Sequence, residues 1–501
     1  MSNANTIDCP SQSGVQSTRT SNVLRTAVAA ALMTAVAGVA QAQSAPAASA
    51  AAATDQSLSW HGITLYGIVD IGLQYENHGA PFGEYHPASS ENIVNKNSRQ
   101  SVTGATSSNL SQSRVGLQGA EPLMGDWTAV FKVETFFNPS TGTISDALKD
   151  QTRNNGRGTN TQTTDIDSSV AGQALQTAYA GVSSKTFGTL TFGRQLTPLA
   201  DGVTKYDPNY GSQAFSLIGM SGTYAGAGDT EDKRVSNSLK YLVNVADVAH
   251  VGLMYKFNQA TGATDTLYQA NVGAEYAGAS VDAYYAKTND AITTSSLSAA
   301  QVTDLGTQGT LLGLPAGYFS VGNSLAATVS DNTTFSLMAS YKIAAFKFLA
   351  GYEHIKYANP HQPLSAAPLN GVGYDNIGGY KLAYVNNTAF PQDKILNVAW
   401  AGVRYTALPG LDLVGAVYYY HQNSYGTDAA NAKCATTAVP AIAGTCSGHF
   451  EAFSFDAVYA FTKRFDGYAG AMYSAVYDGV ASGYTFQRND INPTIGVRFK
   501  F

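Results

Sequence analysis

Charged side chains in this sequence recur at alternate positions of short segments whose other positions are apolar. Arg114 is followed by Val115 and Leu117, and Lys132 stands between two apolar neighbours. Because successive side chains of a strand point to opposite faces, each of these cations would lie on a polar face. Cations arranged in this way could sort solutes by charge, and their pattern indicates no bond-making chemistry.

A later segment repeats the arrangement. Val235, Leu239 and Tyr241 are expected to point outward, which would place Arg234 and Lys240 on the inner side. All four cations are therefore candidates for the lining of a water-filled passage, in which size and lining charge decide what passes.

Histidines raise one alternative, an enzyme built on a β-barrel, which would need an Asp/His or Ser/His pair at the rim of the lumen. His250, His354, His421 and His449 are available, but none stands in a nucleophile motif such as G-x-S-x-G. We therefore expect no catalytic residue, no cofactor and no metal ligand.

The composition favours an all-β protein. The 501 residues include 30 Tyr and 49 Gly but only 16 Pro, and 13% of them are charged. Short tyrosine-rich segments separated by glycine fit neither a disordered chain nor a disulfide scaffold. The formal net charge is −6 and no long run of Lys or Arg occurs, so nucleic acid is not an expected partner.

The N-terminal residues have the features of an export signal. Arg19 and Arg25 precede an apolar stretch over 27–40, which ends in the cleavage pattern Ala40-Gln41-Ala42. Residues 1–42 are therefore predicted to be a signal peptide. An Ala-rich flexible segment over 43–60 would then lead into a membrane domain over 61–501.

Two cysteines would remain after cleavage, since Cys9 belongs to the signal. Cys434 and Cys446 lie twelve positions apart in a loop-like segment. In an oxidising compartment a structural disulfide between them is more probable than a metal site, because no His pair accompanies them at ligand spacing.

Alternation with a period of two recurs throughout the chain and predicts sixteen strands. The predicted strands are approximately 63–75, 111–122, 127–137, 173–183, 188–196, 234–244, 247–258, 267–277, 280–289, 333–343, 346–358, 394–407, 411–422, 449–462, 467–478 and 490–501.

The connections between these strands alternate strictly between short and long. Two-residue joins such as Val245-Ala246 and Ala344-Ala345 contrast with connections that exceed thirty residues. A soluble β-sandwich gives no reason for all long loops to fall at one end, whereas outer-membrane barrels have short periplasmic turns and long external loops. After the signal no apolar run is long enough for a membrane helix, so a closed antiparallel barrel is the expected fold.

Several segments resemble the Gram-negative general porins. They are Ile63-Thr-Leu-Tyr-Gly-Ile-Val-Asp70, Ser113-Arg-Val-Gly-Leu-Gln-Gly-Ala-Glu121, Thr177-Ala-Tyr-Ala-Gly-Val182, Phe187-Gly-Thr-Leu-Thr-Phe-Gly-Arg194 and Gly496-Val-Arg-Phe-Lys-Phe501. The resemblance implies a homotrimer of sixteen-stranded channels in the outer membrane, in contact with its lipids, through which small hydrophilic solutes and ions diffuse passively. A substrate-selective channel is the alternative, and an aromatic slide or a basic ladder in the lumen would favour it.

The resemblance also implies roles for individual residues. The third long connection, 195–233, would fold into the pore, with Asp201 and Asp207 facing the basic wall that includes Arg114 and Arg234. Opposed charges on low-dielectric walls create a transverse field that orders water and disfavours apolar molecules. The barrel-assembly machinery would recognise the terminal residues Val497, Phe499 and Phe501.

Arg194 is an exception to the apolar outer face. It shares parity with Leu190 and Phe192, and a cation facing lipid at the midplane costs ~2–4 kcal/mol. We therefore expect it near an interface or at a subunit contact, paired with a carboxylate from the second long loop of the neighbouring subunit.

Overall fold

The computed structural model describes sixteen stretches of the chain, all within the compact unit Ser57–Phe501. The described residues are 58–78, 101–140, 142–144, 175–218, 234–246, 248–257, 266–289, 293–294, 327–328, 331–358, 366–367, 374–377, 380–383, 392–425, 446–481 and 487–501.

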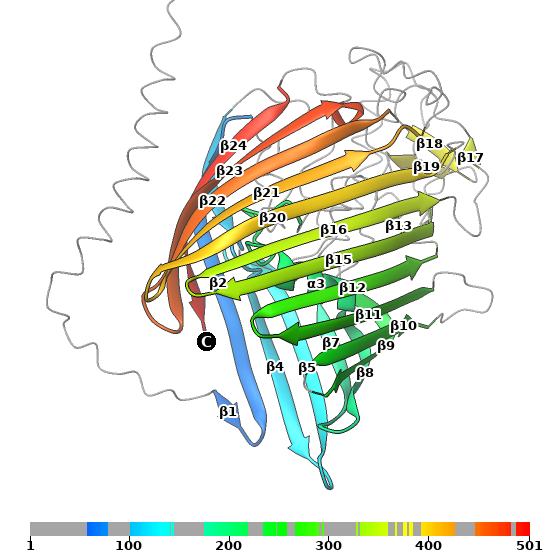
Figure 1. The fold of residues 1–501 in the computed structure, drawn as a ribbon, viewed down its shortest axis with the longest axis vertical. Coiled ribbons are helices and arrows are strands. Elements are labelled where there is room, and N and C mark those ends of the chain that lie inside the picture. Colours follow the sequence, from blue (N-terminus) through cyan, green and yellow to red (C-terminus); the bar gives the residue numbers. More distant parts are fainter. Residues whose placement is uncertain are drawn as a thin grey trace, which may run out of the picture. The chain divides into compact units, whose positions relative to one another are not determined.

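These residues form a closed antiparallel β-barrel of sixteen strands (Figure 1), which confirms the predicted fold class. Around the barrel the strands are β2 (Ile63–Glu76), β3 (Val102–Ser107) together with β4 (Arg114–Pro122), β5 (Trp127–Asn138), β7 (Thr177–Ser184), β8 (Gly188–Leu196), β9 (Arg234–Val245), β10 (Ala249–Lys256), β11 (Leu267–Tyr276), β12 (Ala279–Thr288), β15 (Asp331–Ile343), β16 (Phe346–Ala358), β20 (Lys394–Leu408), β21 (Leu411–Gln422), β22 (Gly448–Ala460), β23 (Phe465–Asp478) and β24 (Asn489–Lys500).

Short additional strands extend the sheet or pair among themselves. β1 (Ser59–Trp60) pairs with β2, and β6 (Thr143–Ile144) pairs with β5. The others are β13 (Thr293–Thr294) with β14 (Ala327–Thr328), and β17 (Ala366–Ala367) with β18 (Tyr374–Ile377) and β19 (Tyr380–Ala383).

The barrel closes where the last strand meets the first. β24 pairs with β2, from Thr494 opposite Gln74 to Lys500 opposite Ile68. One residue further, Phe501 and Gly67 exchange both backbone hydrogen bonds, at 2.9 and 3.1 Å. Each of the sixteen described strands therefore pairs with a neighbour on both sides, as strands in hydrocarbon require, although within the second strand the segment β3 pairs with β2 alone.

Tight turns join the strands at one end, as the spacing predicts. Ala277 and Gly278, between β11 and β12, both have positive φ, at 50° and 84°. This is the backbone of a type I′ turn, whose twist matches that of the two strands it joins.

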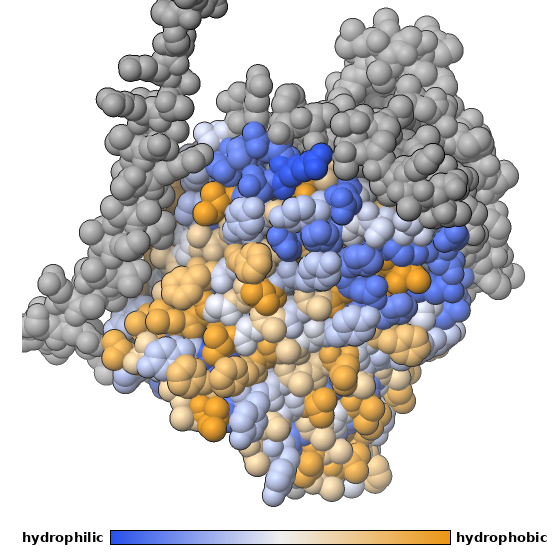
Figure 2. Space-filling view, turned by 45° about the horizontal axis from the view of Figure 1, so that its top comes forward, coloured by the Kyte–Doolittle hydropathy of each residue, from blue (hydrophilic) through white to orange (hydrophobic). Residues whose placement is uncertain are grey.

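The outer surface carries the apolar side chains and the inner surface the polar ones. On β10, Leu253 and Tyr255 are 45% and 41% exposed, whereas Met254 between them is 3% exposed inside the barrel. Figure 2 shows hydrophobic side chains mainly over the lower part of the coloured surface and hydrophilic ones mainly over its upper part. Some polar side chains also face outward, near the strand ends away from the short turns. Asn397 on β20 is the cross-strand neighbour of His354 on β16 and of His421 on β21.

Among the described residues, no helix is long and apolar enough to cross a membrane.

Two local features differ from the predicted pattern. The second barrel strand is broken into β3 and β4, and β3 lies in a segment expected to be loop. In addition, Asn237 has a φ of 56° beside a register shift between β8 and β9, which interrupts the side-chain alternation at the start of β9. Val235, predicted to face outward, is consequently buried against Met254 and Leu267 inside.

Candidate functional site

The third long connection enters the barrel and begins with a helix, α3 (Pro198–Tyr206). Thr197 caps the helix by accepting a hydrogen bond from the Ala200 N–H at 3.1 Å, and Pro198 occupies the first turn. Both are common helix-start signals. Asp201 lies in the same turn, where a carboxylate favours the helix dipole.

The apolar side of this connection packs against the inner face of the wall. Leu199, Val203 and Tyr206 of α3, with Leu217 and Ile218 further along, belong to one buried cluster. Its wall members come from β12, β15, β16 and β20–β23 and include Tyr284, Met338, Ile355, Val398, Trp400, Tyr418, Phe450 and Met472. The connection therefore covers the inner face of these strands, whereas the predicted cations lie on β4, β5 and β9, outside this cluster.

Hydrogen bonds from the wall to backbone carbonyls hold the connection in place. Trp400 donates to the carbonyl of Tyr206 at 3.0 Å, and Arg404 donates to that of Pro208 at 2.8 Å. Because these donors belong to side chains on β20, the connection is fixed to a wall about two hundred positions away in sequence.

Three of the four predicted cations surround one carboxylate, Glu134 on β5. Arg234 lies 3.7 Å from it, Lys132 3.5 Å and Arg114 3.9 Å. Tyr66 on β2 donates to the same carboxylate at 2.9 Å. Glu134 is buried. It was not predicted as a site residue, although its position in the alternation of strand 127–137, on the same side as Lys132, already placed it on the inner face.

The basic wall is open to the lumen at two of these positions. The side chains of Arg114 and Lys132 are 28% and 26% exposed, whereas Arg234 is only 6% exposed. Arg234 also lies over the ring of Phe136, 4.5 Å from its centroid. Two cations therefore reach the aqueous passage and one is held within the wall.

The fourth predicted cation, Lys240, pairs with the third connection. Its ammonium lies 2.7 Å from the Asp201 carboxylate and 3.0 Å from the carbonyl of Leu196. The predicted acid and the predicted base thus meet directly, where the prediction had them facing each other across the passage.

Asp207 differs from its predicted position. It has no exposed surface, and it accepts hydrogen bonds from Tyr418 at 2.8 Å and from the Gly211 N–H at 2.7 Å. The carboxylate points away from the basic wall because the connection turns at 207–211 and directs it toward β21. In this structure Asp207 holds the connection to the wall.

Burial raises the pKa of Asp207, and the hydrogen bonds from Gly211 and Tyr418 only partly offset this effect. An acid with a raised pKa loses docking stability as the pH climbs from its ordinary value to the raised one. Single-channel recordings at acidic and neutral pH should therefore show more open-channel noise at neutral pH. Asp207→Asn should remove this difference, and an unchanged difference in the variant would assign it to other groups.

A family model described as Gram-negative porin matches residues 27–385. The chain belongs to the Gram-negative porin family. It therefore forms an outer-membrane channel for the passive diffusion of small hydrophilic solutes and ions. No curated protein sequence matches it significantly.

Solved structures of outer-membrane proteins share the fold of this porin. The anion-selective porin from Comamonas acidovorans has a TM-score of 0.54 and 16% identity, over 88% of this chain and 99% of that one. A loop L8 deletion mutant of OmpT from Vibrio cholerae has a TM-score of 0.51 and 15% identity, over 88% and 99% of the two chains.

A second polar cluster anchors α3 near the short-turn end of the porin. Lys205 lies 2.5 Å from Glu275 and 3.0 Å from Asp282, and Tyr206 and His250 also bond to Asp282. Burial disfavours the charge of Lys205, but its bonds to Glu275 and Asp282 raise its pKa above the ordinary value. The one Asp/His pair among the described lumen residues thus belongs to the support of the helix.

Arg194 has acceptors within its own chain. It donates to the Ser236 hydroxyl at 2.9 Å and to the carbonyl of Arg234 at 3.3 Å, both at the irregular start of β9. The carboxylates expected to pair with it from a neighbouring subunit, Asp146, Asp150, Asp165 and Asp167, lie outside the described residues.

The remaining predicted residues lie at the C-terminal end. Val497 and Phe499 are exposed on the outer face of β24, and the Phe499 and Phe501 rings are stacked. Cys446 is disulfide-bonded, while its expected partner Cys434 lies outside the described residues.

Proposed function

We propose that this porin is a general diffusion channel that favours small anions. The observation that carries the proposal is the balance of charge at the narrow part of the passage. Four cationic side chains there accompany two carboxylates among the described residues: Arg114, Lys132, Arg234 and Lys240, with Glu134 and Asp201.

The excess positive charge acts on permeating ions because the side chains of Arg114 and Lys132 reach the water, where one carboxylate of the set, Asp201, is also exposed. Low-dielectric walls focus the field of lining charges into a narrow passage and raise the local concentration of counter-ions. The Comamonas porin with the same fold is described as anion-selective, which agrees with this proposal.

A substrate-selective channel is less well supported. An aromatic slide needs rings that contact the solute, but Trp400, Tyr418 and Tyr420 are almost completely buried beneath the third connection. The described lumen aromatics of this wall therefore serve packing.

The proposal includes the other predicted properties of the protein. It works as a homotrimer in contact with outer-membrane lipid, is exported by a signal peptide cleaved after residue 42, and is recognised by the barrel-assembly machinery. It catalyses no reaction and requires no cofactor.

Conductance across a planar bilayer with a salt gradient tests the proposal. The reversal potential of KCl should report chloride passing faster than potassium, and channels should close in steps of three. A potassium preference in the wild-type protein would refute the selectivity, and folded protein without conductance would refute the channel.

Glu134→Gln should strengthen the anion preference, because it removes the carboxylate among three cations and keeps its shape. We expect the chloride-to-potassium permeability ratio to rise roughly two- to threefold, the effect of about 0.5 kcal/mol. Glu451→Gln is the matched control, since Glu451 lies on the outer face of β22 and bonds to Tyr477. Equal ratios in the two variants would contradict the role of Glu134.

A further inference from the structure

The break in the second barrel strand has a defined partner on the first. β3 pairs with residues 71–76 of β2 and β4 with residues 63–68, so that residues 108–113 between them leave the sheet. The break begins at Ser108, whose φ of 63° turns the chain out of the strand.

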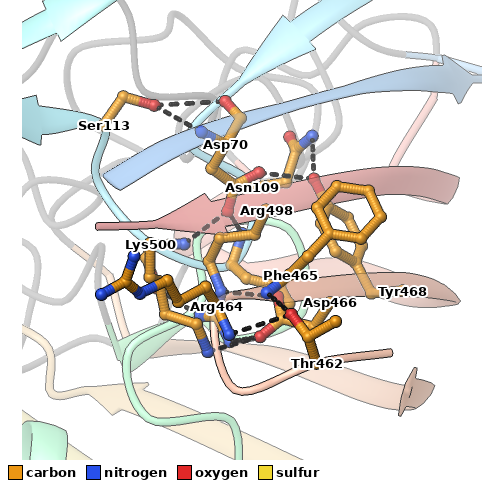
Figure 3. Close-up of polar contacts among 12 residues, drawn as sticks. Asp70, Asn109, Ser113, Thr462, Arg464, Phe465, Asp466, Tyr468, Arg498 and Lys500 are labelled. Atoms are coloured by element: carbon orange, nitrogen blue, oxygen red, sulfur yellow. Dashed lines mark hydrogen bonds and ion pairs between the residues drawn. The ribbon is translucent and has the colours of Figure 1, made fainter. Parts of the chain in front are cut away.

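Asp70 on β2 organises this segment (Figure 3). One carboxylate oxygen accepts the N–H groups of Leu110 and Ser111 at 2.8 and 2.9 Å, and the other accepts the Tyr468 hydroxyl at 2.6 Å. Asp70 has no exposed surface. In an unbroken strand those N–H groups would be used by the sheet, so the break is what makes them available to the carboxylate.

The segment held by Asp70 receives the tip of the third connection. The carbonyl of Asn109 accepts the N–H groups of Gln213 and Ala214 at 2.9 and 3.0 Å and the Ser212 hydroxyl at 2.8 Å. The side chain of Gln213 also donates to Gln112 at 3.1 Å. Four hydrogen bonds therefore join this tip to the broken strand.

The last strands reinforce the same place. Asn109 donates to the Tyr468 hydroxyl at 3.0 Å, and the Tyr468 ring meets Phe215 edge-on at 6.3 Å. Asp466 holds Arg498 at 2.9 and 3.0 Å (Figure 3). Arg498 also donates to the Ser111 hydroxyl at 2.6 Å. The first, second and last two barrel strands thus converge on one seat for the connection.

We propose that residues 108–113 are a docking seat for the tip of the third connection, and that Asp70 is the positioning residue that sets the width of the passage. Without the carboxylate, the N–H groups of Leu110 and Ser111 would lose their acceptor and the seat would lose its shape. The inference rests on the proposed function only in that the connection bounds the narrow part of the channel.

Asp70→Ala should loosen the tip and leave the barrel folded. Losing the hydrogen bonds that Asp70 accepts should raise the fraction of channels with an undocked tip about tenfold. The variant should show more open-channel noise and, in liposome swelling with a series of sugars, a larger size limit. Asp70→Asn should restore both properties, because its amide oxygen still accepts from Leu110 and Ser111. Resistance of the barrel to SDS without heating confirms folding.

Cross-linking gives a readout that does not depend on ion flow. Cysteines introduced at Gln112 and Gln213 should form a disulfide readily in the otherwise wild-type chain, and about tenfold more slowly with Asp70→Ala. If Asp70→Ala does not fold, Tyr468→Phe tests the inference instead, because it removes one donor to Asp70. Its open-channel noise, size limit and cross-linking rate should change in the same direction.

Unchanged noise, size limit and cross-linking rate in a folded variant would overturn the inference. A wild-type channel that prefers potassium would refute the proposed anion preference but leave these three measurements meaningful, so the two failures are distinguishable.

Discussion

Replacing both Arg114 and Lys132 with glutamate should reverse the ion preference of the channel. The narrow part would then hold two cations, Arg234 and Lys240, against four carboxylates. Because Arg114 and Lys132 are the exposed members of the basic wall, the change acts directly on water in the passage. The reversal potential in a KCl gradient is expected to change sign.

The matched control reverses two cations outside the lumen. Lys185 and Lys463 are exposed in short turns, and replacing both with glutamate alters net charge by the same amount. That variant should keep the wild-type reversal potential. If both double variants shifted it equally, net charge and not the basic wall would set selectivity.

Removing Phe501 should strongly reduce the fraction of the protein that folds into a closed barrel. Its backbone exchanges two hydrogen bonds with Gly67, and its ring covers the space that a side chain on Gly67 would need. Loss of these contacts at the seam should lower the folded fraction about tenfold or more. The SDS-resistant, heat-modifiable band on a gel measures that fraction.

Two experimental settings separate the role of Phe501 in closing the barrel from its proposed recognition by the assembly machinery. Refolding of purified protein into detergent or lipid involves no other protein, whereas assembly in cells does. The deletion should impair both, while Phe501→Ala, which keeps the backbone bonds, should impair assembly in cells far more than refolding. Equal effects in the two settings would argue that the ring acts only through packing.

Sequence periodicity predicted the barrel because each strand alternates between lipid and water. The predicted and observed limits agree even for β21 and β16, whose joins are two or three residues long. β3 was missed because Val102-Thr-Gly-Ala-Thr-Ser107 is short and mostly small or polar, so its alternation carries no clear signal. The bulge at Asn237 was missed for a similar reason, since one extra residue leaves no mark in composition.

The alternation of the strands placed Arg114 and Lys132 on the inner face, and in the structure both lie with Arg234 around Glu134. For Arg234 the alternation was misleading, because Val235, expected outside, is buried inside. The helix α3 had a readable start at Thr197-Pro198 that the prediction did not use. The direction of Asp207 could not be predicted, because it depends on Tyr418, which is 211 positions away. Side chains on a connection point where distant strands offer partners, and local sequence does not contain that information.

The buried contacts between α3 and the inner wall would make the proposed ion preference depend on residues from seven described strands. Met472 and Phe450 are buried and do not contact permeating ions, but α3 packs against the cluster to which they belong. Substitutions that introduce smaller side chains into this buried cluster are therefore expected to change the conductance of the channel before they unfold the barrel.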